Sequence, residues 1–221
     1  MSEIGLYEAM STTRAVRRLR PDPLPEGALA KILRAATWAA TGGNVQPWRV
    51  VVVEDPAKKS RLQELYAPEW SRYREAYAGR LDGMPEAARA KAERTLAAGD
   101  HLAANLGRVP VILVFCFDPG RMAITDAGLD RPSIVGGASV YTAVENALLA
   151  ARAEGVGCVL TTLLCFREAE VRELLGVADG WYTAAAVPLG LPVGGGHGKL
   201  TRRAPEQMAF QDVWGEPWRE R

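Results

Sequence analysis

Apolar residues recur along the chain at two different spacings, and these spacings separate the expected helices from the expected strands. Residues 26–40 repeat apolar side chains every three to four positions and keep Lys31 and Arg34 on the other side, which predicts a helix. Residues 109–117 are instead a continuous apolar run rich in Val, Ile and Phe, and residues 48–53 are apolar apart from Arg49 and rich in Val. Runs of this length and composition are typical of strands that are buried on both faces of a sheet.

The same reasoning divides the rest of the chain. Pro21, Pro23 and Pro25 cannot continue a helix, so the segment that follows the first helix is expected to be extended. A loop is expected over residues 120–133, which hold Gly, Pro and Asp. Further helices are expected over residues 3–12, 56–78, 85–106, 135–154 and 167–175, and further strands over residues 157–164 and 182–189.

This order of elements favours an α+β fold in which helices flank a central sheet. A dinucleotide-binding Rossmann unit needs a Gly-rich turn directly after its first strand, whereas Glu54, Asp55 and Pro56 follow the first strand here. We expect one domain over residues 1–221, with a helical excursion at about 56–106 and a C-terminal arm at about 194–221.

Composition and charge exclude several classes of function. The 221 residues carry a net charge of +1, so no long-range attraction to nucleic acid or to a membrane surface is expected. The three cysteines, Cys116, Cys158 and Cys165, lie in apolar runs without a disulfide or metal-ligand spacing. The start of the sequence has no apolar signal core, and we therefore expect a cytoplasmic protein with reduced thiols and no bound metal.

Two basic segments are candidates for binding an anionic ligand. Arg14, Arg17 and Arg18 lie close together in extended chain, and guanidinium groups match phosphate oxygens and the polar edges of flat heterocycles. Arg202 and Arg203 follow a Gly-rich loop near the end of the sequence. On spacing alone, a solvated basic surface is the commoner explanation for each segment.

Two further segments have the composition of a ligand-binding turn. Residues 41–48, Thr-Gly-Gly-Asn-Val-Gln-Pro-Trp, combine flexible backbone with the side chains of Asn44 and Gln46, which both donate and accept hydrogen bonds. Residues 155–163 contain two glycines and then Thr161-Thr162-Leu163 at the end of an expected strand. An ordinary helix cap and turn explain the first segment equally well, and an ordinary strand is the commoner explanation for the second. Nucleophile elbows, phosphate-binding loops, zinc motifs and paired acid/base residues are not found in the sequence.

Taken together, the segments resemble the FMN-dependent nitroreductase family. The similarity rests on four motifs in order: T-T-R-A-V-R-R-L, A-A-T-G-G-N-V-Q-P-W, A-L-L-A-A-R-A-E-G-V-G and A-V-P-L-G-L-P before a basic tail. The resemblance implies a mostly antiparallel central sheet, a swapped homodimer and one FMN at each interface. It also implies which residues bind the cofactor: Arg14, Ala15, Arg17, Thr41, Gly42, Asn44, Gln46, Thr161, Thr162, Leu163, Arg202 and Arg203.

Within this resemblance the residues take different roles. Arg14, Arg202 and Arg203 are expected at the phosphate, Arg17 at the pyrimidine edge, and residues 161–163 are expected to offer backbone amides to flavin N5. The chain departs from the family at Thr13-Arg14-Ala15, where members often have Arg-Arg-Ser, so phosphate binding is expected to depend more on the tail arginines.

The implied activity is reduction of nitroaromatic, quinone or related electron-poor acceptors by NADH or NADPH in a ping-pong mechanism. No catalytic side chain is expected, because the redox chemistry belongs to the cofactor. Trp70 and Tyr73, at helical spacing in the excursion, are candidates for contact with the acceptor. The alternatives are a non-enzymatic FMN-binding or flavin-storage protein, and a specialised enzyme that acts by dehalogenation, desaturation or flavin fragmentation.

Overall fold

The computed structural model describes residues 4–219, and a four-stranded antiparallel sheet forms its centre. The strand order is β1-β2-β4-β3, and each neighbouring pair is antiparallel, as the expected fold class requires. The strands are β1 (Trp48–Val53), β2 (Val111–Phe117), β3 (Gly157–Cys158) and β4 (Tyr182–Gly190). The helices are α1 (Leu6–Thr12), α2 (Ala28–Thr37), α3 (Pro56–Ala78), α4 (Glu86–Asn105), α5 (Ala138–Ala153) and α6 (Glu168–Leu175).

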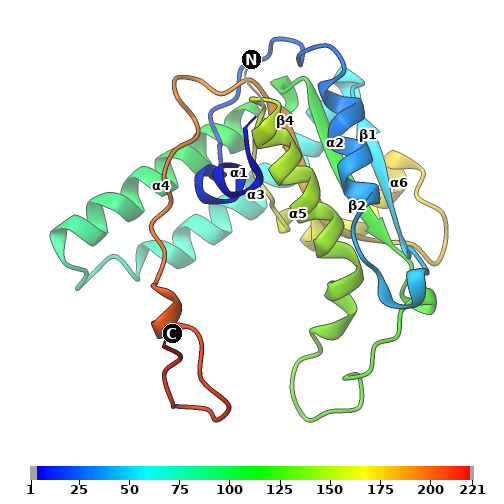
Figure 1. The fold of residues 1–221 in the computed structure, drawn as a ribbon. Helices are drawn as coiled ribbons and strands as arrows, with labels where there is room; N and C mark the ends of the chain where they lie inside the picture. The colour runs from blue at the N-terminus through cyan, green and yellow to red at the C-terminus, as the bar shows by residue number, and fades with distance from the viewer. Residues whose placement is uncertain (1–3, 220–221) are drawn as a thin grey trace.

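Strand β2 explains why the sheet lies between two layers of helices (Figure 1). Successive side chains of a strand point to opposite faces, so an uninterrupted apolar strand needs cover on both sides. Leu113 and Phe115 pack with α2 and α5, whereas Ile112 and Val114 pack with α3 and α6. The continuous apolar run that predicts this strand therefore also accounts for the two hydrophobic clusters.

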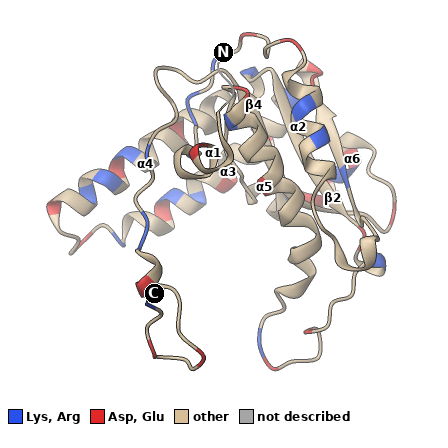
Figure 2. Ribbon diagram, in the orientation of Figure 1, with Lys and Arg blue, Asp and Glu red and all other residues tan. Residues whose placement is uncertain are grey.

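Helices α3 and α4 form a hairpin that begins in the core and projects beyond the sheet (Figure 1). Asp55 caps α3 by accepting a hydrogen bond from the backbone N–H of Lys58, and Pro56 occupies the first turn. The first half of α3 is anchored by Leu62 and Leu65, both buried. The second half meets α4, where Trp70 Nε1 donates a hydrogen bond of 2.8 Å to Asp100 Oδ1. Lys, Arg, Asp and Glu residues recur along both helices of the projecting hairpin (Figure 2).

The strand expected over residues 157–164 is much shorter in the structure. Only Gly157 and Cys158 form β3, a single bridge joins Thr161 to Ala186, and the 3-10 helix η5 (Leu163–Arg167) begins where the strand was expected to end. The apolar residues here are buried through side chains that pack into the core rather than through strand pairing, so their hydrophobicity misled the prediction.

Other boundaries differ by a few residues. The helix expected over 135–154 begins as the 3-10 helix η4 (Val135–Gly137) and continues as α5, and the helix expected over 26–40 is confined to α2. The expected start of the first helix at residue 3 lies outside the described residues. Among the described residues, no helix combines the length and apolar character needed to cross a membrane.

Two segments extend away from the sheet at the lower side of Figure 1. One is the loop between β2 and α5, which is held by Asp126, a buried carboxylate. Asp126 accepts hydrogen bonds from the backbone N–H of Ile134 and the hydroxyl of Ser133, each at 2.8 Å, and pairs with Arg131. The N–H of Ile134, with Ser133 and Arg131, holds the pKa of Asp126 well below its usual range.

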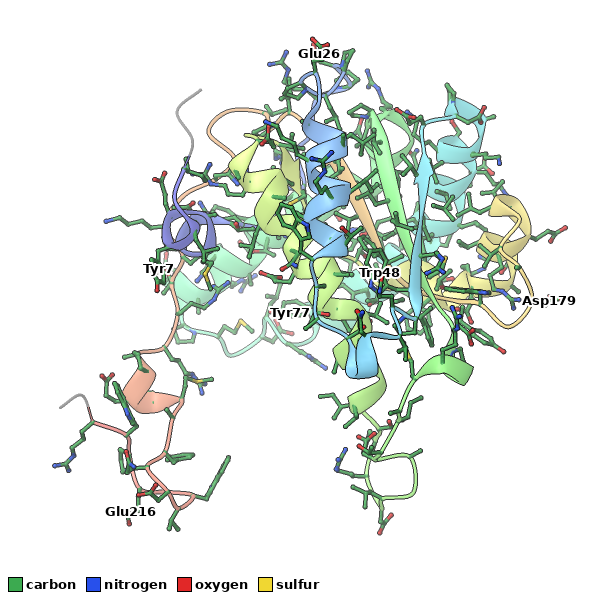
Figure 3. All side chains as sticks on the ribbon, turned by 45° about the vertical axis from the view of Figure 1, so that its right-hand side comes forward. Tyr7, Glu26, Trp48, Tyr77, Asp179 and Glu216 are labelled. Carbon is green, nitrogen blue, oxygen red and sulfur yellow. The ribbon has the colours of Figure 1, made fainter. Side chains whose placement is uncertain are left out.

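The other segment is the C-terminal arm, whose far end is marked by Glu216 in Figure 3. Its apolar side chains are exposed in the single chain: Trp214 is 89% exposed, Met208 65% and Val213 64%. Exposed apolar side chains grouped on one segment are a feature of interaction sites in other proteins.

Candidate functional site

The arginine segment Arg14–Arg18 runs beside the short strand β3, where a parallel bridge joins Ala15 to Cys158. Val16 N donates a hydrogen bond of 2.8 Å to Cys158 O, and the Val16 side chain is buried in the core. This anchor leaves the neighbouring arginines at the surface. The local sequence thus alternates one buried apolar side chain with flanking guanidinium groups.

Gly157 permits this close approach. A Cβ atom at that position would lie 2.8 Å from Leu19 Cδ2 and 2.9 Å from Val16 Cγ1. The glycine therefore lets the arginine segment lie against β3.

Three adjoining pockets surround Arg17. The basic pocket, about 650 Å³, is lined by Arg14, Ala15, Val16, Arg17, Arg18, Lys91, Arg94, Thr95, Ala98, Val193, Gly196 and Thr201. The strand pocket, about 220 Å³, is lined by Arg17, Tyr66, Trp70, Tyr73, Val159, Leu160, Thr161, Thr162 and Leu163. The hairpin pocket, about 370 Å³, lies between α3 and α4 and is lined by Arg17, Trp70, Tyr73, Tyr77, Met84, Ala88, Lys91, Ala92, Thr95 and Leu96.

The basic pocket has a strongly one-sided charge. Five of its lining residues are Lys or Arg, and no Asp or Glu lines it. None of these five takes part in the ion pairs formed among residues 4–219. Since α4 supplies two of the five, Lys91 and Arg94, the excursion contributes to this pocket in a way that the sequence analysis missed. The available signal was their spacing of three residues on one helix.

The strand pocket brings together residues from two of the predicted groups. Arg17 lines it together with Thr161, Thr162 and Leu163, and so do Trp70 and Tyr73. Trp70 is only 8% exposed, because its ring packs against α4, so it both holds the hairpin together and borders the pocket.

Tyr66 is a further polar group at the strand pocket. Burial raises the pKa of the Tyr66 hydroxyl, and a hydrogen bond with the Thr161 side chain and the charge of Arg17 partly oppose this rise. Tyr66 therefore carries a neutral hydroxyl at physiological pH.

The backbone around Thr161 differs in one respect from the expectation. Thr161 N donates to Ala186 O at 2.9 Å, and Ala186 N donates to Thr161 O at 2.8 Å. The Thr161 amide is thus already paired within the sheet, and Leu163 N makes a long contact of 3.4 Å to Thr161 Oγ1. Among the three residues, Thr162 has the backbone amide best placed for a ligand, because no partner for it is found within residues 4–219.

The turn with Thr41, Gly42, Asn44 and Gln46 does not line any of the three pockets. It connects α2 to β1 and is fastened internally, since Gln46 N donates to Thr41 Oγ1 at 3.1 Å and Gln46 Nε2 to Asn44 Oδ1 at 3.1 Å. Asn44 and Gln46 both have positive φ, 55° and 47°. Left-handed backbone at two non-glycine residues of one turn is unusual and is often associated with a functional site.

Only the first part of the tail, up to Thr201, lines the basic pocket. Gly198 N donates to Thr12 O and Leu200 N to Ser11 O, so the segment before Thr201 is fixed beside the arginine motif. Arg202 and Arg203 come directly after Thr201 but do not line the pocket, and Arg202 Nη1 donates to the Thr201 carbonyl. One chain therefore assembles Arg14 and Arg17 with residues 161–163, and leaves the other two predicted groups outside.

Comparisons with known proteins agree with the class of fold. Residues 10–191 match the profile of the Nitroreductase family. This match spans most of the chain, and the protein belongs to the nitroreductase family. The fold class expected from the sequence, a mostly antiparallel sheet flanked by helices, is confirmed.

Individual relatives carry different names. A 5,6-dimethylbenzimidazole synthase of Rhodobacter capsulatus is 29% identical over 212 residues, which cover 95% of this chain and 94% of the relative. An NADH dehydrogenase of Thermus thermophilus is 57% identical over 51 residues, but this alignment spans only 23% of this chain and 25% of the relative. An iodotyrosine deiodinase structure bound to FMN and 3-iodo-L-tyrosine has a TM-score of 0.67 at 23% identity, covering 90% of this chain and 96% of that one.

Proposed function

We propose that this protein is an FMN-dependent oxidoreductase that uses NADH or NADPH to reduce an electron-poor small molecule such as a nitroaromatic compound or a quinone. The observation that carries the proposal is the basic pocket, whose five cations form no ion pair among residues 4–219 and whose lining includes no carboxylate, a combination that suits a phosphate. The strand pocket adjoins it through Arg17 and offers aromatic and aliphatic side chains, hydroxyl groups and the Thr162 backbone amide, for which no partner is found within residues 4–219. The name of the deiodinase structure supports the choice of FMN.

In this scheme the side chains bind and orient, and bound FMN would supply the redox chemistry. Arg14 and Arg18 would hold the phosphate. Arg17, which lines all three pockets, would place a positive charge beside the polar edge of the ring. Trp70 and Tyr73 would exclude water from the opposite side. The overall reaction balances as NADH, a proton and a nitro compound giving NAD⁺, a nitroso compound and water.

The site is proposed to be completed by a second copy of the chain. Turn 41–46 and Arg203 lie outside the pockets of one chain, while the arm and Trp38, Ile134 and Phe166 expose apolar surface. One side of helix α5 is buried within the chain, where Ala143, Ala147 and Ala151 pack in the hydrophobic core. Its other side, with Tyr141, remains open to a partner. We also propose that residues 1–221 form one domain, with a helical excursion at about 56–106 and a C-terminal arm at about 194–221.

The first experiment is the visible spectrum of the purified protein and a titration with FMN. A yellow protein with about one FMN per chain is expected, and Arg14→Ala or Arg203→Ala should weaken FMN binding about 10- to 150-fold. Arg80→Ala, an exposed arginine in the turn between α3 and α4, is the matched control. A colourless protein that does not take up added FMN would contradict the proposal.

A second experiment separates an enzyme from a flavin-storage protein. Oxidation of NADH and NADPH is followed at saturating FMN with a quinone and with a nitroaromatic acceptor. Arg17→Ala is expected to lower the reduction potential of the bound cofactor, because a positive charge near the ring stabilises its reduced anionic form. Binding of FMN without any oxidation of NADH or NADPH would favour storage.

A further inference from the structure

The hairpin pocket between α3 and α4 has the size and walls of a site for a flat aromatic molecule. Its volume of about 370 Å³ lies in the range of small-molecule sites. Tyr73 and Tyr77 stack along one wall, with ring centroids 6.0 Å apart and an angle of 26° between planes. Met84 and Leu96 add apolar surface. Aromatic ligands prefer such offset-stacked surroundings.

This pocket adjoins the strand pocket through shared lining residues. Trp70 and Tyr73 line both, and Arg17 lines both as well. Trp70 is held in place by its hydrogen bond to Asp100 at 2.8 Å. A ligand in the hairpin pocket would therefore lie next to the place proposed for the reactive ring.

The charge of the hairpin pocket is one-sided as well. Arg17 and Lys91 are its charged lining residues, and neither is engaged in the ion pairs among residues 4–219. Three carboxylates of the hairpin are paired elsewhere: Glu69 with Arg72, Asp100 with Arg74, and Glu93 with Arg89. The pocket is thus an apolar, aromatic slot with two unpaired positive charges.

We propose that the hairpin pocket selects a flat aromatic acceptor that carries a negative charge, such as an aromatic carboxylate. The aromatic ring lies along Tyr73 and Tyr77, and the anionic group meets Lys91 and Arg17. This inference rests on the proposed function for the identity of the acceptor, but the binding preference itself depends only on the pocket.

The test is isothermal titration of the FMN-saturated protein with 4-nitrobenzoate and with 4-nitrobenzamide, which share shape but differ in charge. The carboxylate is expected to bind about tenfold more tightly than the amide. Lys91→Gln should reduce this preference to about twofold, whereas Lys58→Gln, an exposed lysine of α3 outside the pocket, should leave it unchanged.

The ratio of the two affinities is the decisive quantity, because Lys91 also lines the basic pocket and any change in FMN occupancy affects both ligands alike. Equal affinities in the wild type, or an unchanged ratio in Lys91→Gln, would overturn the inference. If the protein takes up no FMN, the proposed function fails, while the same titration of the protein as purified still measures the charge preference.

Discussion

Replacing Gly99 by alanine tests how the hairpin is packed. Gly99 lies on α4 against Trp70, and an added Cβ would come within 3.0 Å of three atoms of the indole ring. The ring has little freedom to retreat, since it is 8% exposed and bonded to Asp100. Overpacking of this kind costs about 1–3 kcal/mol. Helix propensity acts in the opposite direction and favours alanine by about 1 kcal/mol.

We expect the steric effect to dominate. With an overpacking cost of about 3 kcal/mol and a gain in helix propensity of about 1 kcal/mol, the free energy of unfolding falls by about 2 kcal/mol. For a chain of this length that loss lowers the Tm by about 4–8 °C. Thermal unfolding followed by circular dichroism measures it. Gly79→Ala is the matched control, because Gly79 ends α3 with φ −62° and a Cβ there would meet open space. This control should be neutral or slightly stabilising.

A double-mutant cycle identifies the contact. In a Trp70→Phe background the ring is smaller, so Gly99→Ala should cost less than it does in the wild type, with a coupling energy of about 0.5–3 kcal/mol. A Gly99→Ala protein as stable as the wild type, or an equal cost in both backgrounds, would refute the reasoning. Since Trp70 also borders two pockets, displacement of its ring should in addition weaken acceptor binding.

Three further outcomes are expected. The hydrogen bonds that Asp126 accepts lower its pKa, so the contribution of Asp126 to stability is complete above the ordinary pKa of about 3.9 and is lost as the pH falls below that value. Urea unfolding at pH 6 and at pH 3 should therefore show a larger loss of stability for the wild type than for Asp126→Asn, and equal losses in the two proteins would contradict this. Burial raises the pKa of Cys116 to about 11 and of Cys158 to about 12, so at pH 8 Ellman's reagent should modify these two thiols at least about a hundredfold more slowly in native protein than in urea. The partly exposed Cys165 should react first, and rapid modification of all three thiols in native protein would contradict this burial. Truncation after Pro205 should weaken both dimer formation and FMN retention. If light scattering showed the truncated protein to be a dimer and its FMN content were full, a role for the arm would be excluded.

Much of the fold is encoded in local sequence patterns. The run Val111–Phe117 is apolar at every position, and this requires a strand covered on both sides, as observed for β2. The helical repeat of residues 28–37 likewise predicts α2, since Ile32 and Ala36 form its buried side. In both segments the periodicity of the backbone and the burial of apolar side chains give the same answer.

The hydrophobic pattern does not predict secondary structure correctly where side chains are buried but the backbone is not paired in a sheet. Residues 157–164 are mostly apolar and include the β-branched Val159, Thr161 and Thr162. Of these eight residues, only Gly157, Cys158 and Thr161 pair with β4 before the chain turns into η5. Val159 and Leu164 are buried all the same, through core packing. Hydrophobicity records that a side chain leaves water, and it does not record which backbone lies beside it.

The candidate site was also predicted from the sequence only in part. The sequence alone identified the arginine segment and residues 161–163 as ligand-binding candidates from their chemistry, and the tertiary structure joined them in the pockets around Arg17. Only the tertiary structure added Lys91 and Arg94, because their position depends on how α4 folds back over the arginine segment. It also separated turn 41–46 from these pockets. Pocket composition depends on contacts between residues distant in sequence, which no local pattern of side chains specifies.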